Sequence, residues 1–153
     1  MESLETFSSL IGHCLPKLLV AFLCGAVIGA EREITGKPAG LRTNMLICGG
    51  AALFTLMSIM IPRQAGSGDT TRIAAQIVTG IGFLGAGTII HEGNVVRGLT
   101  SAATIWIVSA VGMIIGAGFP LLGLSATVTV FLILHFLTKF ERMLQKRRKP
   151  QED

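Results

Sequence analysis

The stretch Gly80-Ile81-Gly82-Phe83-Leu84-Gly85-Ala86-Gly87 places four glycines in eight residues, inside an uncharged apolar run from Ile73 to Ile90. As a helix, the 18 residues of this run would measure roughly 27 Å, close to the thickness of the hydrocarbon core of a bilayer. In water, each glycine would cost such a helix roughly 1 kcal/mol relative to alanine. In lipid the backbone must satisfy its own hydrogen bonds, so the helix persists and glycine allows close helix contact. The run therefore predicts a transmembrane helix.

A helical wheel divides this run into two unequal faces. Ile73, Ile77, Ile81 and Leu84 fall within one narrow arc, while small and polar residues occupy most of the remaining circumference. We interpret the arc as a lipid-facing edge and predict that this is the central helix of a bundle, because small residues let several neighbours approach. The alternative is that glycine is simply common in membrane helices.

The rest of the chain repeats the alternation of apolar runs and polar loops. Half of the residues are apolar and only 14% are charged, a composition typical of membrane proteins. We predict an all-α integral membrane bundle of five transmembrane helices, at about residues 16–30, 43–61, 73–90, 99–116 and 120–138, followed by a basic cytoplasmic tail at 139–153. Residues 1–15 form either an interfacial helix before Pro16 or part of a longer first span.

The distribution of lysine and arginine predicts the orientation of the bundle. With the N-terminus outside, the outer side carries only Lys17, Arg63 and Arg72 of the 13 basic residues, and the inner side carries the other ten. The inner ten are Arg32, Lys37, Arg42, Arg97, Lys139, Arg142, Lys146, Arg147, Arg148 and Lys149. We therefore place the N-terminus outside and the C-terminus in the cytoplasm.

Three groups of residues are candidates for function. The helix-packing candidates are the glycines Gly25, Gly29, Gly80, Gly82, Gly85, Gly87, Gly112 and Gly116. The predicted topology gathers a cytoplasmic charged cluster of Glu31, Arg32, Glu33, Arg42, Glu92 and Arg97, and it leaves Asp69 and Arg72 on the outer face. Gln76 is the main polar candidate within a span. The fourth span also carries a stripe of small residues, including Ser101 and Ser109, that we expect to pack on the glycine-rich helix.

The charged cluster has two interpretations. Glu31 and Glu33 are candidate ligands for a divalent cation such as Mg²⁺, because hard cations prefer carboxylate oxygens. Against this, helix positions two apart point in nearly opposite directions, and the neighbouring arginines would repel a cation. We favour a network of ion pairs at the helix ends, with arginines meeting carboxylates or lipid phosphates.

No catalytic constellation can be assembled from the sequence, so we do not expect an enzyme or a resident cofactor. Gly80-x-Gly82-x-x-Gly85 matches a dinucleotide-binding pattern literally, but it lies inside an apolar span and does not follow a strand. The expected partners are the lipid bilayer, other membrane proteins and a second copy of the chain, and no nucleic acid.

Three blocks of sequence give the chain a resemblance to the bacterial MgtC/SapB family. The blocks are Gly25 to Glu33 continuing through Ala39-Gly40-Leu41-Arg42-Thr43, Arg72 to Gly87, and Val96 to Ala103 with Trp106. The chain is similar to the short members, which lack a soluble C-terminal domain. The resemblance implies a protein of the bacterial inner membrane linked to growth in low magnesium and, in pathogens, to virulence. It also implies a regulator of other membrane proteins. Because of the glycine-rich surface and the uncharged spans, we expect this regulator to act through helix packing; the alternative is a magnesium transporter or channel.

Overall fold

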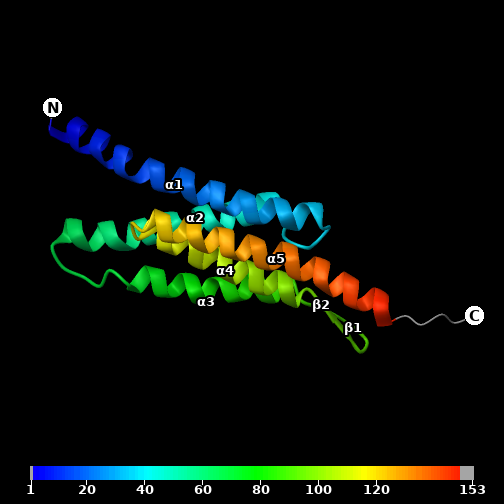
Figure 1. Cartoon of the computed structure of the whole chain (residues 1–153). Coiled ribbons are helices and arrows are strands. Elements are labelled where there is room, and N and C mark those ends of the chain that lie inside the picture. The colour runs from blue at the N-terminus through cyan, green and yellow to red at the C-terminus, as the bar shows by residue number, and fades with distance from the viewer. Residues whose placement is uncertain (1, 149–153) are drawn as a thin grey trace, which may run out of the picture.

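The computed structural model describes the backbone of residues 2–148 and the side chains of residues 11–140 and Met143. This part of the chain forms five helices and one short hairpin (Figure 1). The elements are α1 (Glu2–Ile34), α2 (Leu41–Ala65), α3 (Arg72–Ala86), β1 (Ile90–Glu92), β2 (Val95–Arg97), α4 (Leu99–Gly116) and α5 (Pro120–Arg148). The predicted tail therefore begins inside α5, and residues 149–153 lie outside the described part.

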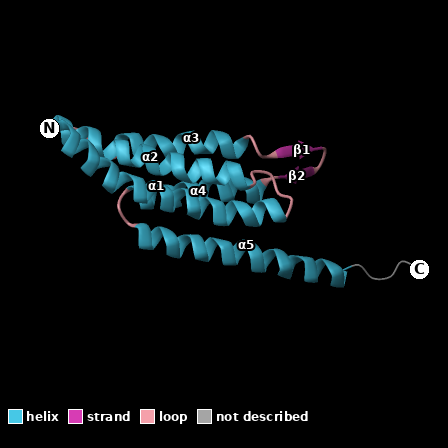
Figure 2. Cartoon of the chain, turned by 90° about the horizontal axis from the view of Figure 1, so that it is seen from above, coloured by secondary structure: helices cyan, strands magenta, loops and turns pink. Residues whose placement is uncertain are grey.

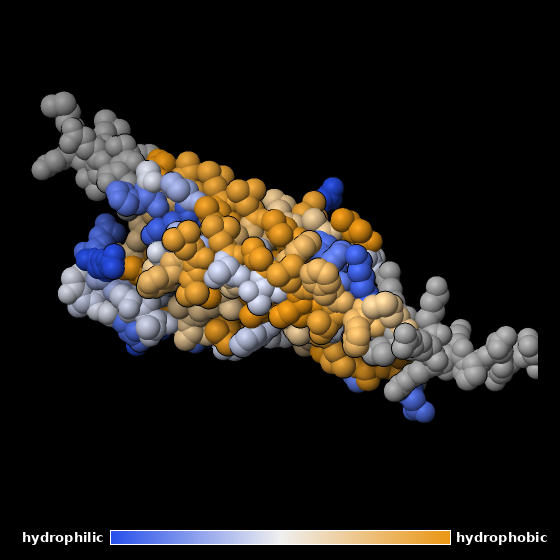
Figure 3. All heavy atoms as spheres, in the orientation of Figure 1, coloured by the Kyte–Doolittle hydropathy of each residue, from blue (hydrophilic) through white to orange (hydrophobic). Residues whose placement is uncertain are grey.

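Four of the described helices are long and apolar enough to cross a membrane: Ile11–Ile34 within α1, α2, α4, and Pro120–Phe140 within α5. Hydrophobic side chains cover the middle of the face seen in Figure 3, and hydrophilic side chains gather mostly toward its ends. Large apolar residues such as Leu23, Leu46 and Leu121 are more than 60% exposed, as expected where lipid replaces water. The chain is therefore a membrane protein built from helices.

The first and third spans differ from their predicted bounds. α1 is continuous through Pro16, so residues before Pro16 extend the first helix. α3 has only 15 residues and ends at Ala86, four residues before the predicted end of the span. The residues that follow form the antiparallel hairpin β1–β2, in which Glu92 pairs with Val95 across the turn Gly93-Asn94. Gly93 has a φ of 60°, a conformation that favours glycine, and a two-residue turn starting with glycine is typical of hairpins.

The prediction of a central glycine-rich helix is wrong. α3 lies at the edge of the bundle in both views and packs on α2 and α4 (Figures 1 and 2). The central helix is α4, which contacts α1, α2, α3 and α5. α4 also supplies Ile105, Val108, Val111 and Ile115 to the hydrophobic core.

The faces of α3 are the reverse of those predicted. Ile81 is buried against the bundle, and Ile73 and Ile77 are partly buried, so the isoleucine arc faces the protein. A Cβ atom added to Gly80 or Gly82 would meet no other atom of the described chain within 4 Å. Isoleucines and the buried Gly85 face the bundle, whereas Gly80 and Gly82 are left on the outside and Leu84 is 51% exposed.

The closest helix contacts are made by glycines of α1 and α4 against α2. A Cβ atom on Gly25 would lie 2.5 Å from the Asn44 carbonyl oxygen, and one on Gly116 would lie 2.5 Å from that of Ala52. Gly29 and Gly112 meet the α2 backbone in the same way, at Leu41 and Cys48. The small-residue stripe of α4 thus packs on α2. Toward α3, α4 presents Ala102, which lies in ordinary van der Waals contact with the Cβ position of Gly85. Gly87 is close only to carbonyls of its own helix.

Candidate functional site

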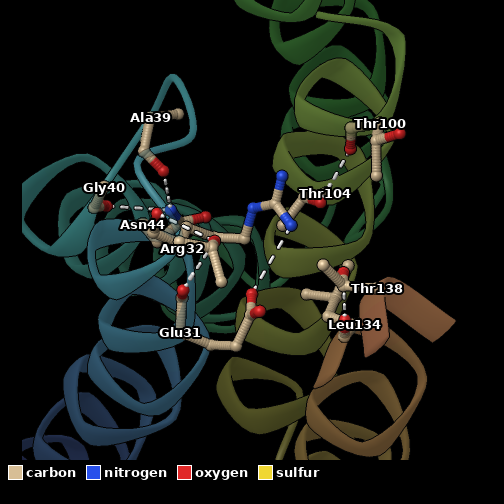
Figure 4. Close-up of polar contacts among 10 residues, drawn as sticks. Glu31, Arg32, Ala39, Gly40, Asn44, Thr100, Thr104, Leu134 and Thr138 are labelled. Carbon is tan, nitrogen blue, oxygen red and sulfur yellow. Dashed lines mark hydrogen bonds and ion pairs between the residues drawn. The ribbon is translucent and has the colours of Figure 1, made fainter. Parts of the chain in front are cut away.

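The last turn of α1 buries two adjacent charged side chains inside the bundle. The side chains of Glu31 and Arg32 are 3% and 2% exposed, and Arg32 Nη1 lies 3.4 Å from Glu31 Oε2 (Figure 4). Figure 4 shows the guanidinium extending from α1 toward α4, beside Thr104. A cation in the last turn of a helix is favoured by the helix dipole, which explains why arginine is tolerated at this position.

This ion pair leaves several polar atoms without a partner. Among the described residues, Glu31 Oε1 and Arg32 Nε and Nη2 are buried and have no hydrogen-bond partner. The Thr104 hydroxyl donates to the Thr100 carbonyl at 2.7 Å, but its oxygen can still accept a hydrogen bond. Unpaired buried charges are costly, and such atoms are typically satisfied by ordered water or a small polar ligand. A group bound beside Arg32 would have to be neutral or anionic, because the guanidinium repels cations.

Glu33 and Asn44 organise the loop between α1 and α2. The exposed Glu33 carboxylate accepts a hydrogen bond of 2.9 Å from the Leu41 N–H at the start of α2. The buried Asn44 side chain donates to the Ala39 and Gly40 carbonyls, at 2.5 and 2.9 Å (Figure 4). These contacts hold Ala39 at its positive φ of 59°. The hydrogen bonds of Glu33 and Asn44 thus stabilise the turn between α1 and α2.

The two carboxylates proposed as cation ligands have different environments. Glu31 is buried beside Arg32, whereas Glu33 is exposed and caps α2. Over the described residues, no group of three or more histidine, cysteine, aspartate or glutamate side chains could hold a metal ion. The geometry therefore gives a divalent cation no site formed jointly by Glu31 and Glu33.

The other members of the predicted cytoplasmic cluster lie apart from this buried pair. Glu92 and Arg97 face each other across the hairpin at 3.8 Å and are at least 60% exposed, so their interaction is weak. Arg42 is exposed and forms no ion pair within the described chain. Among the described side chains, the charged residues predicted to form ion pairs at the helix ends thus form two separate pairs, one buried and one exposed.

The opposite end of the bundle ties α2 to α3. The Ser58 hydroxyl of α2 donates to the Thr70 carbonyl at 2.6 Å and accepts the Ala74 N–H at 3.3 Å. The exposed carboxylate of Asp69 accepts hydrogen bonds from the Thr71 hydroxyl and N–H at 2.6 and 2.8 Å. The hydroxyl of Thr71, then its N–H, and more weakly the charge of Arg72 hold the pKa of Asp69 below its usual value. Arg72 is the first residue of α3 and is exposed.

Sequence reasoning did not single out the buried hydroxyls of Ser58 and Thr104, and it assigned Ser109 only a packing role. Ser109 is 2% exposed, and its Oγ has no partner within the described residues. Serine and threonine are ordinary constituents of membrane helices, so no pattern distinguishes these positions. Gln76, which the sequence did single out, is exposed on α3.

Comparison with known proteins identifies the family. The family model described as "MgtC family" matches residues 18–143. The chain is 50% identical over 123 residues to "Protein MgtC" of Brucella abortus (strain 2308), covering 80% of this chain and 50% of the relative. It is 46% identical to "Putative magnesium transporter YhiD" of Escherichia coli (strain K12), covering 76% of this chain and 56% of the relative. It is also 51% identical to "Protein MgtC" of Salmonella typhimurium (strain LT2), over 74% of this chain and 47% of the relative.

The chain spans about half the length of the curated relatives it matches. No solved structure matches it significantly. The matched region begins within α1 and ends within α5, so it includes the buried pair, the glycine interfaces and the hairpin. On this evidence the chain belongs to the MgtC family.

Proposed function

We propose that this protein regulates other membrane proteins by packing one face of α3 against them. The observation that carries this proposal is the outer α3 face, formed by Ala75, Thr79 and Gly82. These residues are exposed and spaced four and three apart, so they form one stripe along the helix. A Cβ atom on Gly82 would meet nothing within 4 Å in the described chain. A foreign helix could therefore approach the α3 backbone closely.

The physical basis is the way helices associate in lipid. Apolar side chains gain little by leaving lipid, so close backbone approach between small residues supplies much of the attraction. Within the bundle, Gly25 and Gly29 already use such contacts against α2. The outer α3 face has the same composition but no neighbour within the described chain. Its partner is then another membrane protein or a second copy of this chain.

This function requires α3 to cross the membrane. Its 15 residues measure about 22 Å, less than the roughly 30 Å of an average hydrocarbon core, and such a mismatch is accommodated by local thinning of the bilayer. In support, α3 runs alongside α2 and α4 (Figures 1 and 2). We propose five crossings in the bacterial inner membrane, with the N-terminus outside and the C-terminus in the cytoplasm.

The proposed physiological context is growth in low magnesium and, in pathogens, virulence. The word magnesium in the name of the YhiD relative supports the first part. A regulator in this context changes the activity of its partner and need not carry ions itself.

The test replaces residues of the outer α3 face by leucine and measures how much of the partner membrane proteins copurifies with the chain. Thr79→Leu and Gly82→Leu should each reduce, by tenfold or more, the membrane proteins that copurify with the full chain in mild detergent. Thr129→Leu is the matched control, because Thr129 is equally exposed on α5. The same two variants should lose complementation of growth in low magnesium. A protein that purifies alone, with growth unaffected by either variant, would refute the proposal.

Magnesium transport is the second candidate, favoured by the unpaired Glu31 Oε1 inside the bundle and by the name of the YhiD relative. The Arg32 guanidinium next to it counts against a cation path. Vesicles containing the purified chain and a magnesium-sensitive dye distinguish the two functions. Magnesium influx that Glu31→Gln abolishes would establish transport, and absence of influx into vesicles with the wild-type chain would exclude transport as the function.

A further inference from the structure

A long groove separates α2 from α3 and has α4 as its floor. Its volume is about 950 Å³. Leu46 and Phe54 line the α2 side, Phe83 and Leu84 line the α3 side, and Ile105 lies in the floor. These four wall residues are between 51% and 84% exposed, so the groove is open; its lining is mostly apolar and also includes the polar side chains of Gln76 and Ser109. In the membrane such a surface must be covered by lipid or by another apolar molecule.

One end of the groove is polar and positively charged. The start of α2 contributes Arg42 and Thr43, and the residues after α3 contribute Gly87 and Thr88. Arg42 is the one charged residue among those that line the groove. It is exposed and has no acidic partner within the described chain. A free guanidinium at a membrane-surface end of an apolar groove complements an amphiphile with an anionic head.

The size of the groove distinguishes between two possible occupants. A helix of 15 residues, treated as a cylinder 10 Å wide and about 22 Å long, occupies roughly 1,700 Å³. This is nearly twice the groove volume, so a helix from a second copy would enter only with its side chains. By contrast, about 950 Å³ falls within the range of roughly 300–1,000 Å³ that encloses small molecules.

We infer that the groove between α2 and α3 binds one anionic glycerophospholipid of the bilayer. Arg42 holds the phosphate, Thr43 and Thr88 offer hydroxyls to the same group, and an acyl chain lies along the apolar walls toward Phe54. The site is separate from the outer α3 face, because Ala75, Thr79 and Gly82 do not line the groove. The lipid would fix the distance between α2 and α3 and thereby the angle at which the outer face is presented.

The headgroup is tested by native mass spectrometry of the full chain with added phosphatidylglycerol or phosphatidylcholine of identical acyl chains. The wild type should bind phosphatidylglycerol about fivefold better, the factor that corresponds to about 1 kcal/mol for one basic residue near the surface. Arg42→Gln should abolish this preference, and Arg42→Lys should retain part of it. Arg63→Gln, at the other end of α2, is the matched control and should behave as wild type.

The acyl chain is tested by filling the groove. Gly50 lines the groove and has free space around it, so Gly50→Phe should reduce the binding of both lipids by tenfold or more. Gly12→Phe adds the same side chain at an open position of α1, outside the groove, and should change neither. Circular dichroism and gel filtration verify that each variant is folded. Equal binding of the two lipids by wild type, or a preference that survives Arg42→Gln, would overturn the proposal. A dimer that Gly50→Phe dissociates would assign the groove to a second copy instead.

Discussion

Replacing one glycine by alanine at Gly116 and at Gly82 separates the packing role of glycine from its helix propensity. Both residues lie in apolar helices, and both variants add a single methyl group. At Gly116 the added Cβ would lie 2.5 Å from the Ala52 carbonyl oxygen and 3.0 Å from Ala52 Cα and Thr55 Cβ. At Gly82 it would meet nothing within 4 Å in the described chain.

The expected magnitude follows from these distances. Ordinary van der Waals contact begins at 3.4 Å, so α4 and α2 must separate by about 1 Å, and the obstacle is backbone that cannot rotate away. Overpacking of this kind costs about 1–3 kcal/mol. The gain in helix propensity, at most about 1 kcal/mol, applies at both sites and cancels in the comparison. Gly116→Ala should therefore be about 1–3 kcal/mol less stable than Gly82→Ala.

The assay is equilibrium unfolding by sodium dodecyl sulfate in mixed micelles, followed by circular dichroism. Gly82→Ala should be as stable as wild type or slightly more stable, because nothing in the chain opposes its methyl group. If the two variants differ by less than about 0.5 kcal/mol, or if Gly82→Ala is the less stable one, the assignment of α4 as the tightly packed centre and α3 as the open edge is refuted.

The remaining predictions concern the two ends of the bundle. Ser58→Ala removes both hydrogen bonds that join the Ser58 hydroxyl of α2 to the start of α3, so it should destabilise the protein by about 1–3 kcal/mol. It should also accelerate hydrogen exchange in the first turn of α3, and an unchanged exchange rate would contradict this prediction. Arg32→Leu leaves the Glu31 carboxylate buried without its partner and should lower the free energy of unfolding by about 3–5 kcal/mol in the same assay. The double variant Glu31→Leu/Arg32→Leu should recover much of this loss, and a double variant less stable than the single one would disprove the reasoning. Because the folded pKa of Asp69 is lowered, its carboxylate stabilises the fold above the unfolded pKa, and this contribution is lost as the pH falls through the folded pKa. Thr71→Val should raise the pKa of Asp69 toward its usual value in a carbon-13 NMR titration, and an unchanged pKa would show that the hydroxyl is not the cause.

The buried pair shows how far a candidate site can be read from the sequence. The order Glu31-Arg32-Glu33 shows that charges follow directly after an apolar span. It cannot show which of them turns inward, because that depends on where α4 and α5 pass the end of α1. Arg32 lies beside Thr104, a residue 72 positions further along the chain, and this proximity has no local signature in the sequence (Figure 4). The same holds for Ser58, which binds the start of a different helix.

The glycine-rich helix shows the limit for the fold. Its composition correctly predicted an apolar helix, but the helical wheel alone left open which arc faces protein. In the structure the isoleucines face inward. The wheel could not decide this, because the outside of a membrane protein is also apolar and hydrophobicity does not distinguish the interior from the lipid. The hairpin after α3 was missed because Thr88, Ile89 and Ile90 continue the apolar run beyond the end of the helix.

The sequence by itself determined the class of this protein, the approximate position of its apolar helices and its family. The class and the helix positions follow from local composition and from the absence of charge, which act over a single helix, whereas the family follows from the resemblance of three blocks of sequence. Only the tertiary structure decided that α4 is central and α3 peripheral, and that Gly80 and Gly82 face outward while Gly112 and Gly116 meet α2. The physical reason is that helix order in lipid depends on shape complementarity between distant surfaces, which no single segment encodes.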